Sequence, residues 1–278
     1  MPLTPLPDIE IFDPIASPGV KYGTRNQPVI MLCQSQSGVS EDGYISHFVV
    51  KLKNDLPYKE HSCAREMIGS LLATAFGLLT PPPGIINIPD DFYEIVDNQA
   101  LRDRLQASSG YNFGSRNVEI NAFLGVDLPP GKLQEGFEVF VFDALIQNSD
   151  RRVGNPNLFS SPDGFILFDH ELAFPFTKTV GIIGGFPNPW ELTDPRYLYF
   201  LKDHIFYQSV RSNKVNFDSF HEKLTNLTEP FIDGIISKLP DEWYGKEIEI
   251  IKDYLMLAHH NADKVKKGLQ EVLAWPVN

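Results

Sequence analysis

Two aspartates and an asparagine near the middle of the chain have the types and spacing that phosphoryl transfer requires. Asp150 is followed five residues later by Asn155, and Asp169 ends an apolar run fourteen residues beyond that asparagine. In such an arrangement one carboxylate orients the attacking hydroxyl and accepts its proton, while an amide and a second carboxylate hold Mg²⁺ against nucleotide phosphates. The pattern predicts that Asp150 is catalytic and that Asn155 and Asp169 bind metal.

The loop around Asp150 also has a plain structural interpretation, because Asn, Asp and Gly are common in loops that cap helices. The spacing from Asp150 to Asn155 alone is therefore weak evidence. The residues that follow form a Leu-Phe strand, a Pro-Asp-Gly turn and a second apolar strand ending at Asp169, which favours the catalytic interpretation. Asn157 competes with Asn155 for the metal role, and the five-residue spacing favours Asn155.

A lysine and a glutamate in the first third of the chain complete the expected set. Lys51 lies on a predicted strand, residues 44–52, and Glu66 lies fifteen residues later on a predicted helix, residues 58–79. The amine of Lys51 would bind the α- and β-phosphates of ATP, and Glu66 would hold the amine in position. On spacing alone, a surface lysine and a solvated helix glutamate are an equally good interpretation.

The phosphates of the nucleotide also need backbone cover. No Gly-x-Gly-x-x-Gly segment occurs. We therefore expect the polar turn between the first two predicted strands to supply this cover, through Ser35, Ser37 and Gly38 at its tip.

The elements that must position these residues change in type along the chain. Residues 1–27 are rich in proline and turn formers and are expected to wrap the surface. Strands are predicted at residues 29–33, 44–52, 85–88 and 111–120, and helices at residues 58–79, 90–107, 133–147, 194–210, 217–239 and 246–273. The pattern predicts an α+β, bilobal fold, with a strand-rich N-lobe at 1–118, a helical C-lobe at 119–278, and the nucleotide between them; the resemblance described below implies that this fold is protein-kinase-like.

Composition narrows the classes of partner. The 278 residues carry a net charge of −12 and contain no run of Lys and Arg, so contact with nucleic acid is not expected. No apolar run approaches the ~20 residues of a membrane span, so membrane insertion is not expected. Cys33 and Cys63 are interpreted as buried thiols, and the chain as a soluble cytoplasmic protein.

These motifs resemble those of the HipA-like kinases, bacterial relatives of the protein-kinase fold. The resemblance covers roughly residues 28–250 and rests on Asn148-Ser149-Asp150, Asn155, Asp169, Lys51 in VVKL, Glu66 in REM, and Phe113-Gly114-Ser115-Arg116. It implies a kinase that uses ATP and Mg²⁺ and transfers the γ-phosphate to a hydroxyl, with a protein Ser or Thr as the expected acceptor. A more distant likeness links residues 148–174 to type II phosphatidylinositol 4-kinases.

The sequence departs from ordinary protein kinases at two places. His170-Glu171 stands where they carry Phe-Gly, and Asn148-Ser149 stands where they carry His-Arg. We expect no counterpart here of the extra amino-terminal subdomain of HipA toxins, which argues against toxin activity. An antitoxin-type partner is possible, but no feature of the sequence supports it. Two alternatives remain open: a nucleotide-binding pseudokinase that acts as a regulatory module, and a lipid or small-molecule kinase on the same fold.

Overall fold

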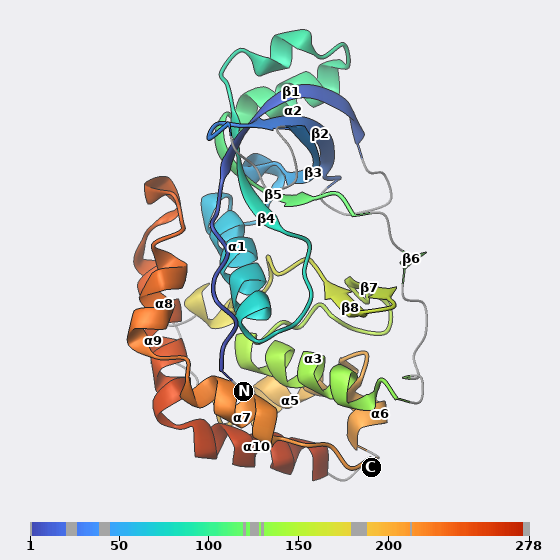
Figure 1. Ribbon diagram of the computed structural model, residues 1–278, viewed down its shortest axis with the longest axis vertical. Helices are drawn as coiled ribbons and strands as arrows, with labels where there is room; N and C mark the ends of the chain where they lie inside the picture. The colour runs from blue at the N-terminus through green and yellow to red at the C-terminus, as the bar shows by residue number, and fades with distance from the viewer. Residues whose placement is uncertain are drawn as a thin grey trace.

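The computed structural model describes residues 2–20, 27–38, 45–118, 121–122, 128, 131–178, 188–211 and 213–274. It is an α+β protein, as predicted, with a small β-barrel at one end and a set of helices at the other (Figure 1). Helix α1 and the β7–β8 hairpin lie between these two ends. None of the described helices combines the length and apolar character of a membrane span.

Five strands form the closed barrel in the order β1-β2-β3-β5-β4. Their bounds are Ile11–Val20 for β1, Val29–Ser35 for β2, Ile45–Lys51 for β3, Pro83–Ile88 for β4 and Gly110–Arg116 for β5. The barrel closes because β1 pairs antiparallel with β2 and parallel with β4. Inside it, the rings of Phe12 and Phe48 lie 4.5 Å apart, and alternate residues of β2 face inward. The four predicted strands of this region are confirmed.

Strand β1 was not predicted, because its sequence contains prolines that normally argue against a strand. Proline cannot donate a ladder hydrogen bond and is tolerated only at edges and bulges. Here the pairing register of β1 with β2 shifts between Pro14 and Ala16 and again between Ala16 and Gly19. These irregularities accommodate the ring of Pro14 within a paired strand. The expected surface wrapping holds for residues 2–10, where the Thr4 amide donates to the Ala75 carbonyl.

Helix α1 runs from Glu60 to Ala75 and is buried on all sides. It packs against β4 and β5 of the barrel and also against α8 in the helical end. The sequence predicted that only one face of this helix would be buried. The whole circumference is buried instead, because the helix lies between two layers of the structure. The position of α1 lets it carry a side chain into the space between barrel and helices.

The helical end contains most of the larger hydrophobic core. Its α-helices are α3 Leu133–Ile146, α5 Pro195–Asp203, α6 Tyr207–Arg211, α7 Asp218–Thr225, α8 Glu229–Ile236, α9 Lys246–His260 and α10 Ala262–Ala274. The long helices predicted at 194–210, 217–239 and 246–273 are each divided in two. Helix α2, Gln99–Ala107, belongs to the barrel end, and short 3₁₀ turns occupy Lys53–Asp55, Phe92–Ile95, Pro175–Lys178 and Asp241–Trp243.

The predicted hairpin is present as β7, Leu158–Ser161, and β8, Gly164–Leu167, with the short strand β6, Asn121–Ala122, beside β7. Helix α3 ends at Ile146, its C-cap residue Gln147 has a left-handed backbone with φ 53°, and the chain then turns into the Asp150 loop. The helix end and the hairpin together bring Asp150 and Asp169 to the same side of the molecule.

Candidate active site

Lys51 is the centre of a compact charged cluster. Its Nζ contacts Glu66 Oε1 and lies 2.7 Å from Asp169 Oδ1 and 3.2 Å from Glu171 Oε2. The three carboxylates come from α1 and from the turn after β8. The side chain of Lys51 is 13% exposed and that of Glu66 is 1% exposed. The alternative of a surface lysine and a solvated glutamate is therefore wrong.

Backbone hydrogen bonds fix Glu66 to the turn that follows β8. Glu66 Oε2 accepts from the His170 amide at 2.9 Å, and Glu66 Oε1 accepts from the Glu171 amide at 3.1 Å. The turn includes Asp169 in the left-handed region, with φ 66°. A non-glycine residue in this region costs about 1–2 kcal/mol, and these contacts help to hold it there. Glu66 thus positions both the lysine and the second aspartate.

His170 fills the space between this turn and α1. Its side chain is fully buried, and its ring meets Phe142 edge-on. A Cβ at Gly69 would lie 2.5 Å from the His170 Cβ, so only glycine permits this close approach. Burial lowers the pKa of His170 to about 3, which keeps the ring neutral near pH 7. His170 therefore acts as a packing side chain at the position where protein kinases carry Phe.

The electrostatics of the cluster suit a divalent cation. Burial disfavours the charged forms, but the adjacent Asp169 and Glu66 hold the pKa of Lys51 well above its usual value. Burial raises the pKa of Glu66 to about 7 against the opposing effect of Lys51. Burial also acts to raise the pKa of Asp169, yet Lys51 outweighs it and the pKa is lowered. One amine thus faces three carboxylates, and the carboxylate and amide oxygens at the site are the hard donors that Mg²⁺ prefers.

The Asp150 loop presents both candidate asparagines to one carboxylate. Asp150 Oδ2 accepts from Asn155 Nδ2 at 2.8 Å and from Asn157 Nδ2 at 3.2 Å. The Asp150 amide donates to Asn148 Oδ1 at 3.2 Å. The competing asparagines are therefore neighbours, and both lie beside the predicted catalytic carboxylate.

A buried ion network beneath the loop was missed by sequence reasoning. Asp143 Oδ2 accepts from Arg151 Nε at 2.6 Å and pairs with His204 Nε2 at 3.0 Å. Arg151 also donates to the carbonyls of Asn157 and Phe168, the latter at 3.3 Å. Arg151 therefore ties the Asp150 loop to the segment that leads into Asp169. The available signal was a charged residue, Asp143, within the otherwise apolar residues 139–146 of α3.

A cleft of about 590 Å³ connects these groups. Its walls include Lys51, Glu66, Asp150, Asn155, Asn157, Asp169 and Glu171. On the barrel side the walls also include Phe113 and residues 115–118, at the end of β5 and just beyond it. The cleft thus has a charged end around Lys51 and a wall that contains Phe113 and the backbone after β5.

The turn expected to cover the phosphates lies elsewhere. Ser35 Oγ donates to Glu10 Oε2 at 2.6 Å and lies 2.8 Å from Ser37 Oγ, and Ser35, Ser37 and Gly38 do not line the cleft. The reason is strand direction. Pro28, just before β2, lines the cleft, and β2 runs away from it for seven residues, or roughly 20 Å at about 3.3 Å per residue. The end of β2 that carries Ser35 is therefore the end far from the cleft.

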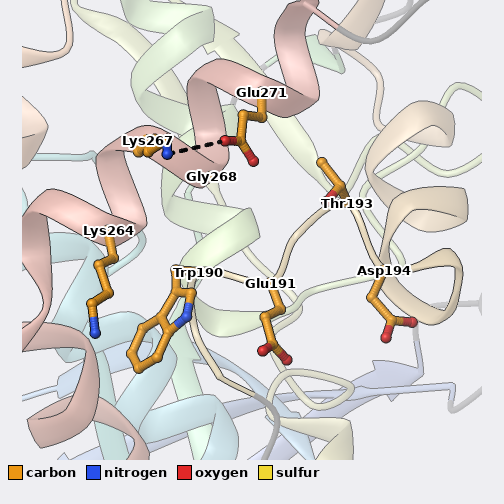
Figure 2. Close-up of a pocket in the computed structure, with 8 residues that line it drawn as sticks. All are labelled: Trp190, Glu191, Thr193, Asp194, Lys264, Lys267, Gly268 and Glu271. Atoms are coloured by element: carbon orange, nitrogen blue, oxygen red, sulfur yellow. Dashed lines mark ion pairs between the residues drawn. The ribbon is translucent and has the colours of Figure 1, made fainter.

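Another hollow, of about 740 Å³, lies where the chain entering α5 meets α10 (Figure 2). Lys264 lies over the Trp190 ring at 4.6 Å, and Lys267 pairs with Glu271 along the helix. Gly268 allows close packing, because a Cβ there would lie 2.3 Å from the Trp190 carbonyl oxygen. These contacts anchor the segment before α5 to α10, and no residue expected to be catalytic lines this hollow.

Comparison with protein families agrees with this geometry. The family described as HipA-like kinase matches residues 32–181, just over half of the chain, and this stretch includes every charged residue of the Lys51 cluster. The chain belongs to the HipA-like kinase family. Membership implies a kinase-like fold and a kinase. No curated protein matches the chain.

The contact of Gly69 with His170 predicts a packing defect. We expect Gly69→Ala to lower the free energy of unfolding by about 1–3 kcal/mol, because the new methyl overlaps the His170 Cβ. Gly234→Ala is the control, since its Cβ would meet Leu6 at an ordinary 3.4 Å and alanine favours a helix by up to ~1 kcal/mol. Urea unfolding measures both. Equal effects at the two positions would contradict the packing assignment.

The network around Asp143 predicts a pH effect on stability. The Phe206 amide donates to His204 Nδ1 at 3.1 Å, so the neutral ring carries its proton on Nε2, facing Asp143. Burial lowers the pKa of His204. Below its unfolded pKa of about 6.5, the unfolded chain binds a proton that the folded protein excludes, so stability falls as pH falls.

We expect His204→Gln, which retains an N–H donor for Asp143, to reduce the loss of unfolding free energy between about pH 7.5 and 5.5 by roughly 1 kcal/mol. His47→Gln, at an exposed position, is the control and should leave the loss unchanged. Urea unfolding at each pH provides the measurement. An unchanged slope for His204→Gln would show that His204 is not held neutral.

Proposed function

We propose that this HipA-like kinase is an ATP- and Mg²⁺-dependent enzyme that transfers the γ-phosphate of ATP to a hydroxyl of a protein Ser or Thr. The observation that supports it most is the 2.7 Å contact between Lys51 and Asp169, which lie 118 residues apart in sequence. The contact brings the amine that we propose binds phosphate beside the carboxylate that we propose binds metal, and Asp150 lines the same cleft.

The nucleotide end of the site consists of Lys51, Glu66 and Asp169. Lys51 binds the α- and β-phosphates, and Glu66, fixed by two backbone amides, keeps the amine from rotating away. Asp169 and Asn155 would hold Mg²⁺, with Asn157 as the second amide candidate. When bound, the ion neutralises charge on the phosphates.

The acceptor end consists of Asp150 and its amide partners. Asp150 orients the acceptor hydroxyl, whose oxygen forms a bond to the γ-phosphorus while the bond from that phosphorus to the bridging oxygen of ADP breaks. The hydroxyl proton passes to the Asp150 carboxylate. Asn155 and Asn157 donate to Oδ2 of this carboxylate and fix its plane, so the rate gain comes from positioning.

We also propose that the cleft divides two lobes, residues 1–118 and 119–278. Residues 116–118 line the cleft next to this boundary. Their backbone groups are suited to hydrogen bonds with a nucleotide base, and Phe113 supplies an apolar face. Helix α1 belongs to the first lobe by sequence, yet it packs into the larger core with the C-terminal helices.

The alternatives are a pseudokinase module and a kinase for lipids or small molecules. The convergence of Lys51, Glu66, Asp150, Asn155 and Asp169 in one cleft supports the enzyme, because a binding module has no physical need for the acceptor carboxylate. Calorimetric titration with ATP, with and without Mg²⁺, together with a phosphate-transfer assay, distinguishes the pseudokinase module from the proposed enzyme. Binding without turnover on any acceptor would favour the module.

One prediction from the proposed function concerns the acceptor carboxylate, Asp150. We expect Asp150→Ala to lower γ-phosphate transfer from labelled ATP to proteins of a host lysate by about 10²–10⁴-fold, the usual contribution of general acid–base catalysis, with the far-ultraviolet circular dichroism spectrum unchanged. Asp163→Ala, in the exposed turn of the β7–β8 hairpin, is the control and should retain transfer. Undiminished transfer by the Asp150→Ala protein would refute its role.

Another prediction from the proposed function concerns nucleotide binding. We expect Lys51→Met to raise the Kd for ATP with Mg²⁺ at least tenfold in a calorimetric titration, because the phosphates lose their cationic partner. Lys53→Met is a matched control two residues along the chain, where the amine faces Glu60 at 3.8 Å and Glu242 at 3.6 Å outside the cleft. Equal affinities of the two variants would remove Lys51 from the site.

A further inference from the structure

A third and smaller hollow lies next to the Asp150 loop. Its volume is about 260 Å³, enough for one side chain, and we call it the flanking pocket. It is lined by Arg152, Val153 and Gly154 of the loop and by Lys202, Asp203, His204, Ile205 and Gln208 at the junction of α5 and α6. None of these residues except Arg152 lines the nucleotide cleft.

The backbone that forms the flanking pocket is firmly held. Arg152 makes backbone bridges to Asn155 and to His204, and the Ile205 amide donates to the Arg151 carbonyl at 3.2 Å. The ring of His204 is fixed below by Asp143. Backbone hydrogen bonds therefore join the two walls of the pocket and give it a preformed shape, which favours recognition.

The flanking pocket lies within one side-chain length of the acceptor carboxylate. Arg152 lines both the pocket and the cleft, and its Nε is 3.8 Å from Asp150 Oδ1. A peptide whose hydroxyl approaches Asp150 extends by about 3.3–3.6 Å per residue. A side chain two or three residues from the hydroxyl would therefore reach the pocket.

The charge of the flanking pocket differs from that of the whole molecule. The chain carries −12, yet Arg152 and Lys202 stand on opposite walls with Asp203 as the single lining acid. The Arg152 side chain is 58% exposed, so its charge is accessible. A carboxylate bound in the pocket would be attracted by Arg152 and Lys202 at contact distance. Salt screens its repulsion by acidic residues that lie more than about 8 Å away.

The flanking pocket also has an apolar lining. Val153 and Ile205 line it, and Val153 is 52% exposed in the loop. These surfaces suit the aliphatic part of a peptide beside its charged group. A volume of 260 Å³ is too small for a lipid headgroup with its chains.

We propose that the flanking pocket binds an Asp or Glu side chain of the acceptor protein, two or three residues from the phosphorylated Ser or Thr. The inference rests on the proposed kinase function and adds its substrate class: a protein segment with an acidic residue near the acceptor. Arg152 and Lys202 contact the carboxylate, and the apolar surfaces contact the adjacent peptide.

The test is a Ser/Thr peptide library in which each flanking position is varied in turn, with labelled ATP and Mg²⁺. We expect the natural protein to prefer Asp or Glu at one fixed position by at least fivefold. Lys202→Glu should abolish this preference or convert it to Lys or Arg. Lys202→Gln should lose the preference without converting it, and it serves if the charge reversal disturbs folding.

Lys267→Glu is the matched control, because it makes the same charge change in the hollow of Figure 2, on α10. With the best acidic peptide, we expect Lys202→Glu to raise the peptide KM at least tenfold, with kcat and the KM for ATP within twofold of the natural values. The Lys267→Glu protein should match the natural protein in all three constants.

The outcomes separate this inference from the proposed function. Phosphorylation of peptides without acidic preference, or a preference that both Lys202 variants retain, would overturn the inference and leave the kinase intact. If ATP with Mg²⁺ binds but no peptide is phosphorylated, while a lipid or small molecule is, both the pocket's role and the protein acceptor are overturned. Failure to bind ATP would contradict the proposed function itself.

Discussion

The structure depends on the burial of one lysine among three carboxylates. Lys51 comes from the barrel, Glu66 from the central helix, and Asp169 and Glu171 from the turn after the hairpin. Each of these groups would be costly to bury alone, because an isolated charge loses its hydration. Together they are stable, but only if the three elements keep their relative positions. The cluster therefore links the geometry of the barrel to that of the helical end.

The supporting features of the fold follow from that requirement. The His170 and Glu171 amides fix Glu66, and the approach of His170 to Gly69 sets the distance between the turn and α1. On the other side, Arg151 joins the Asp150 loop to the segment before Asp169 through two carbonyl groups. The two aspartates are thus positioned by buried contacts, and several of these involve residues that do not line the cleft, namely Gly69, Arg151 and His170.

The part of the site between Asp150 and Asp169 could be predicted from the sequence, because its residues are close together in the chain. The spacing of Asp150, Asn155 and Asp169 and the hairpin between them depend on short-range sequence, and the structure brings them into one cleft. Strand β1 was missed because its register shifts depend on the barrel that surrounds it. Ser35 was misplaced because the direction of a strand relative to a cleft is a tertiary property.

The buried network of Asp143, Arg151 and His204 could not be predicted from local sequence either. Asp143 and His204 lie 61 residues apart, and nothing in the local pattern of either indicates that they meet. The break between α5 and α6 falls at His204, the residue that makes this contact and the backbone bridge to Arg152. Local periodicity predicts helices well here, but it does not predict where a helix must break to complete a site elsewhere.

The most direct test of the central claim is a crystal structure with Mg²⁺ and a non-hydrolysable ATP analogue. We expect the base beside residues 116–118, the α- and β-phosphates within hydrogen-bond distance of Lys51, the metal on Asp169, and the γ-phosphate facing Asp150. A nucleotide bound away from Lys51, or phosphates that contact neither Lys51 nor a metal on Asp169, would contradict that claim.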